Sequence, residues 1–266
     1  MSKFVVVIFP NEAKAYEGTR ALKELHAEAS LAVYAVAVVT KGADGKLSVK
    51  EAADNGPLGL GVGALVGGLI GLLGGPAGAA IGIGVGALIG SFNDLFNMGV
   101  GSDFLDKVSK ELAPGKAAVV AEVAEDWITP LDTRMGAIGG TVVREQRTDF
   151  EDEMIEKEAK ERKAEIAQLK EEITHASGEA KAKLTARMDE ARAKLRNASD
   201  RMEAQISRLQ QETDAQIRVL QGQAAKAAAN AKTKIDQRIS ELRADHERRS
   251  AKLKQAWKLT KEAFAA

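Results

Sequence analysis

The segment between Asp54 and Asp94 places the strongest constraint on the fold, because its 39 residues carry no formal charge and contain 14 of the protein's 25 glycines. Glycines recur at every fourth residue on both sides of the sequence Gly74-Gly75-Pro76. This spacing places small residues along one face of a helix, and a proline after two glycines interrupts a helix. The segment therefore predicts a hairpin of two apolar helices over residues 56–92, each with a glycine face.

The glycine faces predict close contacts between helices. Each glycine in a helix costs about 1 kcal/mol relative to alanine in water, so lipid or a tight protein assembly favours such a hairpin. Each arm has about 18 residues, near the lower limit for a membrane span, and a spanning, a re-entrant and a protein-buried hairpin all fit that length. The residues predicted to mediate packing and oligomerisation are Gly59, Gly63, Gly67, Gly71, Gly74, Gly78, Gly82, Gly86 and Gly90.

The sequence on either side of the hairpin, residues 1–55 and 93–147, predicts one small α/β domain. Helical spacing of apolar residues follows the first β-branched run, and Ser102 and Asp103 are suited to cap a second helix. The order of elements predicts an α+β fold with a ferredoxin-like sheet built on a split βαβ unit and interrupted after its third strand. The runs that predict strands are 3–9, 31–40, 47–52, 116–124 and 141–146.

The last zone, residues 148–266, is charged and alanine-rich, and its apolar residues repeat every eleven positions. Eleven residues correspond to three turns, which gives a nearly straight apolar seam along a coiled-coil helix. The repeat continues through Gly178 and Gly222, which predicts one helix of about 170 Å. The predicted seam residues are Ile173, Leu184, Leu195, Ile206, Leu209, Ile217, Leu220, Ile239 and Leu242.

A seam of this length exceeds what a domain of roughly 100 residues covers. Neither "ASGEA" nor "QGQAA" is a strong turn signal, so we expect the helix to pack against other copies of the chain, with an unidentified protein partner as the alternative. Near its basic end, Trp257 and Phe264 are seven residues apart and share a face with lysines around them. This arrangement fits either lipid contact or the end of a coiled coil.

No residue pattern points to catalysis, a cofactor or a metal. The chain has no cysteine, and its three histidines lack the spacing of metal ligands. The glycine pattern from Gly61 to Gly67 lacks the preceding strand and the following Lys-Ser/Thr of a nucleotide-binding loop, and its glycines continue every four residues. Formal charges of −4 over residues 1–150 and +4 over 151–266 are too small to indicate nucleic-acid binding. The N-terminus does not resemble a signal peptide, so we expect it to lie in the cytoplasm.

The order of these features resembles a bacterial family described as predicted membrane proteins and as domain of unknown function 1269. The resemblance covers residues 1–147, and its most specific part runs from the hairpin through "LAPGKAAVV". It rests also on "VVVIF", "PNEAKAYEGTRALKEL" and the final "GGTVVRE". It implies a ferredoxin-like domain with a membrane-associated helical insert and no established activity, and it does not include the C-terminal repeat.

These observations predict a non-enzymatic, membrane-associated protein that forms homo-oligomers and acts as a structural scaffold. Copies would pack through the glycine hairpin and the long helix, on the cytoplasmic side of the inner (plasma) membrane. One alternative is a cytoplasmic, soluble scaffold with the hairpin buried in its core and the helix recruiting a partner. Another is a ferredoxin-like module that senses a ligand.

Overall fold

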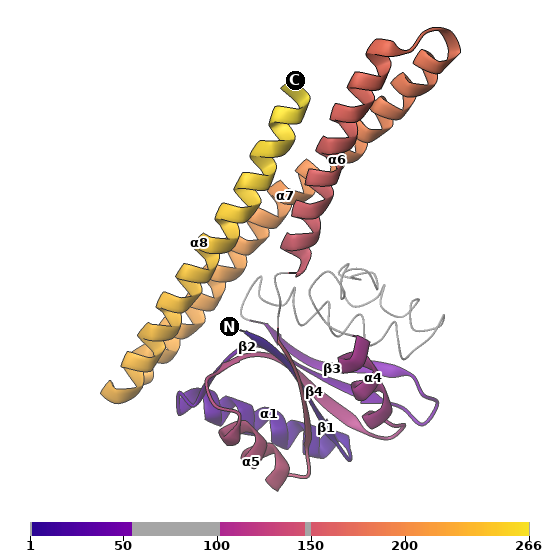
Figure 1. Cartoon of the computed structure of the whole chain (residues 1–266). Helices are drawn as coiled ribbons and strands as arrows, with labels where there is room; N and C mark the ends of the chain where they lie inside the picture. Colours follow the sequence, from indigo (N-terminus) through magenta and orange to yellow (C-terminus); the bar gives the residue numbers. More distant parts are fainter. Residues whose placement is uncertain (1, 55–101, 147–149, 266) are drawn as a thin grey trace. The chain divides into compact units, whose positions relative to one another are not determined.

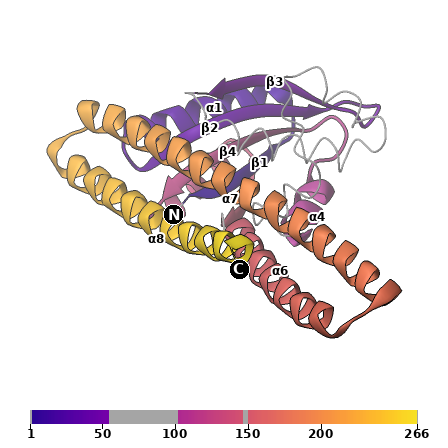
Figure 2. The ribbon, with the colours of Figure 1, turned by 90° about the horizontal axis from the view of Figure 1, so that it is seen from above.

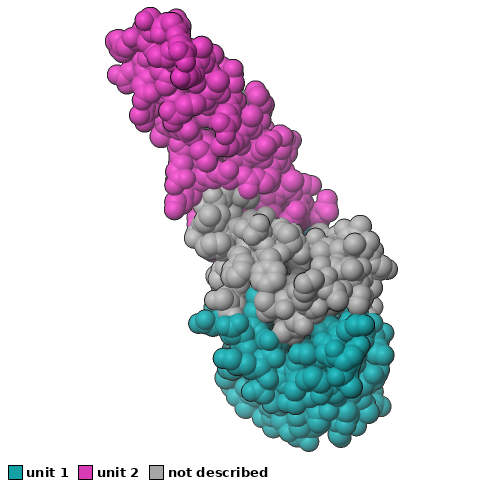
Figure 3. All heavy atoms as spheres, turned by 90° about the vertical axis from the view of Figure 1, so that its right-hand side faces the viewer, with its two compact units in different colours: residues 1–148, 212–242 teal, residues 149–211, 243–266 magenta. Residues whose placement is uncertain are grey.

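The computed structural model describes residues 2–54, 102–146 and 150–265. The predicted glycine hairpin over 56–92, with all nine of its predicted packing glycines, lies outside the described residues. The chain forms two compact units, and Figure 3 colours them separately. Unit 1 comprises residues 1–148 and 212–242, and unit 2 comprises residues 149–211 and 243–266. The units therefore divide the C-terminal zone, because residues 212–242 group with the α/β domain.

Unit 1 is built on a five-stranded antiparallel sheet with the strand order β3-β2-β4-β1-β5. Helix α1 (Glu12–Ala27) connects β1 to β2, and β4 lies between these two strands. Strands that precede and follow the segment 55–101 pair directly, so that segment interrupts a single sheet. The α+β prediction is confirmed. The strands are β1 (Lys3–Phe9), β2 (Leu31–Lys41), β3 (Leu47–Asp54), β4 (Ala117–Glu125) and β5 (Thr141–Gln146).

Helices cover both faces of this sheet, which explains why β1, β2 and β4 are apolar almost throughout. On one face, α1 and α5 (Thr129–Ala137) pack on a cluster that includes Val5, Val7 and Leu22 (Figure 1). On the other face, α4 (Ser102–Glu111) packs through Phe104 and Leu105. Alternating residues along each strand contribute to the two clusters, as the two-residue period of a strand requires.

Gly18 is the point of closest approach between α1 and the sheet. A Cβ atom at this position would lie 2.4 Å from Cζ of Phe9, and Phe9 is 1% exposed. We expect Gly18→Ala to lower the free energy of unfolding by about 1–2 kcal/mol, because overpacking outweighs the better helix propensity of alanine. Urea unfolding followed by circular dichroism measures this change.

Gly136 on α5 provides the matched control, because a Cβ atom there would meet no atom within 4 Å. Gly136→Ala should leave the stability unchanged or raise it by up to about 1 kcal/mol. If both variants lost the same free energy of unfolding, the close approach of α1 to Phe9 would not be the cause of the loss in Gly18→Ala.

The C-terminal zone is helical, but the prediction of one continuous helix is wrong. It forms α6 (Phe150–His175), α7 (Gly178–Lys226) and α8 (Ala229–Ala265). The first break ends at Gly178, which has a φ of +57°, in the left-handed region that glycine adopts without steric cost. The second break, at Ala227 and Ala228, has no such residue. There the apolar contacts made by the two flanking helix ends compensate for the lost helical hydrogen bonds.

In unit 2, α6 lies beside the first part of α7, as both ribbon views show, and the last part of α8 packs with them (Figures 1 and 2). Ala159, Met202 and Ala256, one from each helix, form a buried cluster. Asp152 is 2% exposed, and its carboxylate accepts hydrogen bonds from Arg249 Nε at 2.6 Å and from Gln205 Nε2 at 3.2 Å. A buried ion pair inside an apolar cluster favours one alignment of the three helices.

Candidate functional site

Residues 212–242, which we call the arm tip, pack on the same face of the sheet as α4, but on a different part of it. The arm tip is the end of α7, the turn after it and the start of α8. It packs on a patch that we call the docking face, formed by Ala29, Ala32, Tyr34 and Ala124. The arm tip contributes Ala215, Leu220, Ile235 and Ile239 to the same buried cluster.

An irregularity in β2 directs Tyr34 into this contact. The pairing of β2 with β4 shifts its register between Val33 and Ala35, so Tyr34 is the additional residue of a β-bulge. A bulge redirects a side chain relative to the regular ladder. Tyr34 is 1% exposed and is the only large apolar side chain of the docking face, whose other three members are alanines. The docking face therefore contributes little apolar area to the contact apart from Tyr34.

Polar side chains supply the other contacts between the arm tip and the domain. Gln216 Nε2 donates to Glu122 Oε1 at 3.1 Å. Gln223 Nε2 donates to the carbonyl oxygens of His26 at 2.6 Å and Leu31 at 2.8 Å. These bonds join α7 to α1, β2 and β4. They fix the position of the arm tip more specifically than alanine contacts do.

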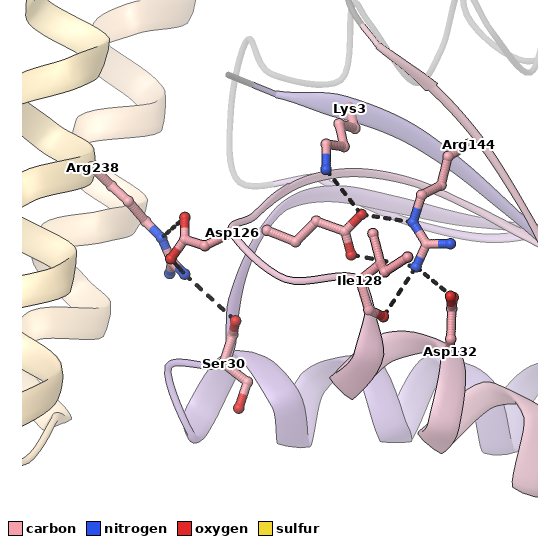
Figure 4. Close-up of polar contacts among 8 residues, drawn as sticks. Lys3, Ser30, Asp126, Ile128, Asp132, Arg144 and Arg238 are labelled. Carbon is pink, nitrogen blue, oxygen red and sulfur yellow. Dashed lines mark hydrogen bonds and ion pairs between the residues drawn. The ribbon is translucent and has the colours of Figure 1, made fainter.

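Arg238 of α8 forms an ion pair between the arm tip and the domain. Its guanidinium donates to Asp126 Oδ2 at 2.7 Å and to the carbonyl oxygen of Ser30 at 3.5 Å, as Figure 4 shows. Arg238 is 5% exposed, whereas the Asp126 side chain is 45% exposed. The arginine is thus buried against a carboxylate that water still reaches, which screens the pair and moderates its contribution to stability.

A second cluster lies directly beside Asp126, around Glu125, the last residue of β4. The Glu125 side chain is fully buried and accepts hydrogen bonds from Arg144 Nε at 2.6 Å and Lys3 Nζ at 3.3 Å. Arg144 also donates to Asp132 Oδ1 at 2.5 Å (Figure 4). Consecutive carboxylates therefore serve two purposes: Glu125 joins β1, β4, β5 and α5, and Asp126 holds α8.

Two ionisable side chains under the arm tip, Tyr34 and His26, have pKa values shifted in the direction that favours their neutral forms. Burial raises the pKa of Tyr34 far above its usual value of about 10, and the charge of Glu122 raises it further. Burial also lowers the pKa of His26, and Lys226 adds to this effect. His26 Nδ1 accepts a hydrogen bond from the main-chain N–H of Val33 at 3.2 Å. Buried or half-buried, uncharged side chains of this kind are suited to holding the arm tip against the α/β domain. Among the described residues, no group of three or more metal-ligating side chains could hold an ion.

The structure places the predicted seam residues on the inner faces of the helices within one chain. Leu195, Leu209, Leu220 and Ile239 are buried, and the other five are half-buried. Leu220 and Ile239 pack on the docking face, and Leu195 packs with Ile166 in unit 2. Much of the stripe is therefore covered without a second copy, because the helical zone folds back at two turns.

The residues predicted to contact lipid are placed only in part. Trp257 is half-buried beside the cluster of Ala159, Met202 and Ala256, and the Nζ atom of Lys261 lies 3.5 Å from the centroid of its ring. The side chain of Phe264 lies outside the described part of the structure. Among the described residues, no helix combines the length and the apolar character that crossing a bilayer requires.

Sequence reasoning missed the polar residues of the arm tip, although they follow the same eleven-residue repeat. One register of the repeat carries mainly buried polar side chains instead of apolar ones. Two of them, Gln216 and Arg238, pair with the domain in unit 1. Another two, Gln205 and Arg249, pair with Asp152 of α6 in unit 2. A set of polar residues that recurs every eleven positions beside an apolar stripe was the sequence signal that could have predicted these contacts. The positions of this register are Gln205, Gln216, Ala227, Arg238, Arg249 and Thr260, of which Ala227 alone is apolar.

Comparison with known proteins identifies part of the chain. Residues 61–160 match the model of a family described as "Protein of unknown function (DUF1269)". The match confirms the resemblance to DUF1269 that the sequence motifs indicate. It includes Glu122, Ala124, Glu125 and Asp126, so the DUF1269 segment carries the β4 side of the docking contact, and the arm tip lies beyond it. No curated protein and no solved structure matches the chain.

Proposed function

We propose that this protein is a non-enzymatic scaffold that assembles with copies of itself at the cytoplasmic face of the plasma membrane. The observation that carries the proposal is the uncharged segment with its two four-residue glycine ladders, which leaves the sheet after β3 and returns to the same domain at α4. A glycine-lined apolar insert is the kind of element that packs closely with other helices in lipid or in an assembly.

The α/β domain supplies the folded platform of this scaffold. The arrangement β5-β1-β4-β2, in which β4 separates β1 from β2 and α1 connects them, supports a ferredoxin-like domain with β3 added at its edge. Because the arm tip and the helices of unit 2 cover much of their own apolar stripe, we assign the contacts between copies to the insert and not to a parallel stalk of long helices.

Vesicle flotation combined with mass measurement tests the proposal. The full chain should rise with phospholipid vesicles in a density gradient, and a variant with residues 56–92 replaced by a short glycine–serine linker should stay at the bottom. In detergent, light scattering should give a mass of several chains for the wild type. Gly67→Leu with Gly82→Leu should reduce this to one chain, because bulky side chains hold the helix backbones apart.

Gly67→Ala with Gly82→Ala is the matched control, because alanine keeps these positions small, and it should retain the assembly. A wild-type chain that stays at the bottom of the gradient but remains oligomeric would contradict the membrane role and favour the soluble scaffold. A wild-type chain that has the mass of one copy would contradict self-assembly altogether.

A further inference from the structure

His26 occupies a position where it can control the contact between the arm tip and the domain. It lies in the last turn of α1, and its half-buried ring faces α7. Because a main-chain N–H of Val33 donates to Nδ1, that nitrogen carries a lone pair and the neutral ring has its proton on Nε2. The Nε2 atom of Gln223, also a donor, lies 3.4 Å from the same Nδ1.

A proton on Nδ1 would have no acceptor in this arrangement. It would face two N–H donors, and the Val33 N–H would lose its partner. Rotating the Gln223 amide does not relieve this conflict. Its oxygen would then face the carbonyl oxygens of His26 and Leu31, to which Nε2 now donates. Gln223 is 5% exposed, so little water reaches the site to replace the lost bonds.

The charged groups around His26 oppose protonation or are already paired. Lys226 comes from α7 and lowers the pKa of the imidazole in addition to burial. From α8, Lys234 lines the same pocket of about 360 Å³ as Lys226, and Arg238 is paired with Asp126. On α1 itself, Glu24 and Glu28 are paired with Arg134 of α5. β2 presents the N–H of Val33 and the carbonyl of Leu31 at this point.

We propose that docking of the arm tip is a pH-sensitive contact in which neutral His26 permits docking and protonated His26 releases it. The direction follows from linkage. The docked state disfavours the proton, so a fall in pH through the range where free histidine titrates, near 6.5, favours the undocked state. The polar, alanine-rich docking contact suits a reversible association.

Release would uncover Tyr34 on the docking face and the stripe of Leu220, Ile235 and Ile239 on the arm tip. This proposal goes beyond the scaffold function and does not rest on it, because docking is a contact within one chain. A failed flotation experiment would therefore leave it standing.

Distance measurement between two spin labels tests the proposal on the full chain. The protein has no cysteine, so Lys23→Cys on α1 and Lys232→Cys on α8 provide unique labels at exposed positions. Double electron–electron resonance should show one short distance at pH 7.5. As the pH falls from 7.5 to 5.5, the ratio of docked to undocked molecules should fall by up to about tenfold. This is the limit for one histidine that has a pKa of about 6.5 in the undocked state and is not protonated in the docked state. A Lys23→Cys and Lys110→Cys pair within the domain should not respond.

Two histidine variants separate His26 from other titrating groups. In His26→Asn the amide oxygen can accept the Val33 N–H bond but cannot titrate, so the ratio should change less than twofold. His246→Asn, in unit 2, should keep the full response. A wild-type ratio that does not change with pH, or a His26→Asn response equal to that of the wild type, would overturn the proposal.

A titration of the His26 ring by nuclear magnetic resonance provides a second, independent measurement if His26→Asn does not dock. Leu220→Glu places a charge in the buried cluster and should undock the arm tip. The measured pKa of His26 should then move up toward 6.5, because docking and protonation are linked reciprocally. Equal pKa values in Leu220→Glu and the wild type would contradict the proposal.

Discussion

Replacing Tyr34 with alanine should lower the free energy of unfolding of unit 1 by about 3–5 kcal/mol and release the arm tip. Tyr34 is 1% exposed and is the only large side chain among the alanines of the docking face. Its removal leaves a cavity that Ala29, Ala32 and Ala124 are too small to fill. Urea unfolding gives the stability change, and hydrogen exchange of the amides in residues 212–242 reports the release.

Tyr34→Phe separates packing from the hydroxyl. It keeps the ring in the cluster, so the loss should stay within about 1 kcal/mol and the exchange of the arm tip should match the wild type. A similar loss in both variants would mean that the hydroxyl, not the ring, holds the contact. Unchanged exchange of the arm tip in Tyr34→Ala would mean that the polar bonds of Gln216, Gln223 and Arg238 are sufficient for docking.

Glu125→Ala should destabilise the α/β domain by about 2–4 kcal/mol. Its fully buried carboxylate is the common acceptor for Arg144 and Lys3. Removal leaves the partly buried cations with fewer partners, and breaking a buried pair from one side typically costs 3–5 kcal/mol. We expect a somewhat smaller loss than this typical cost because Arg144 keeps its bond to Asp132. Chemical unfolding of the isolated variants provides the measurement.

Glu125→Gln is the conservative comparison for this cluster. The amide oxygen still accepts a bond from Arg144, but the negative charge is lost, so the destabilisation should be smaller than in Glu125→Ala. If both variants were as stable as the wild type, the cluster would have no role in joining β1, β4, β5 and α5.

The α/β domain was predictable because its signals are local. Short apolar or alternating runs bounded by turn residues form the five strands. The side chain of Asn11 caps α1 by accepting from the Lys14 N–H at 2.9 Å. The family resemblance was equally accessible, since it rests on contiguous motifs. The extra residue at Tyr34 was not predictable, because a β-bulge depends on how two distant strands align.

The folding of the C-terminal zone was not predictable from turn signals. An eleven-residue repeat defines an apolar face but does not identify what covers it. The break at Ala227 and Ala228 lies in an alanine-rich stretch that favours helix, and the contacts of Leu220, Ile235 and Ile239 with the docking face favour the turn there. Tertiary packing outweighs local helix propensity at such positions, because propensity differences are only tenths of a kcal/mol per residue.

The sequence by itself determined the strands, the α+β class, the uncharged glycine segment and the eleven-residue stripe, because each depends on neighbouring residues or on a fixed period. Only the tertiary structure decided where the helical zone turns back, and that its polar register meets Glu122, Asp126 and Asp152. The physical reason is that these contacts join residues up to about a hundred positions apart. Their free energy depends on burial and geometry that no local pattern encodes.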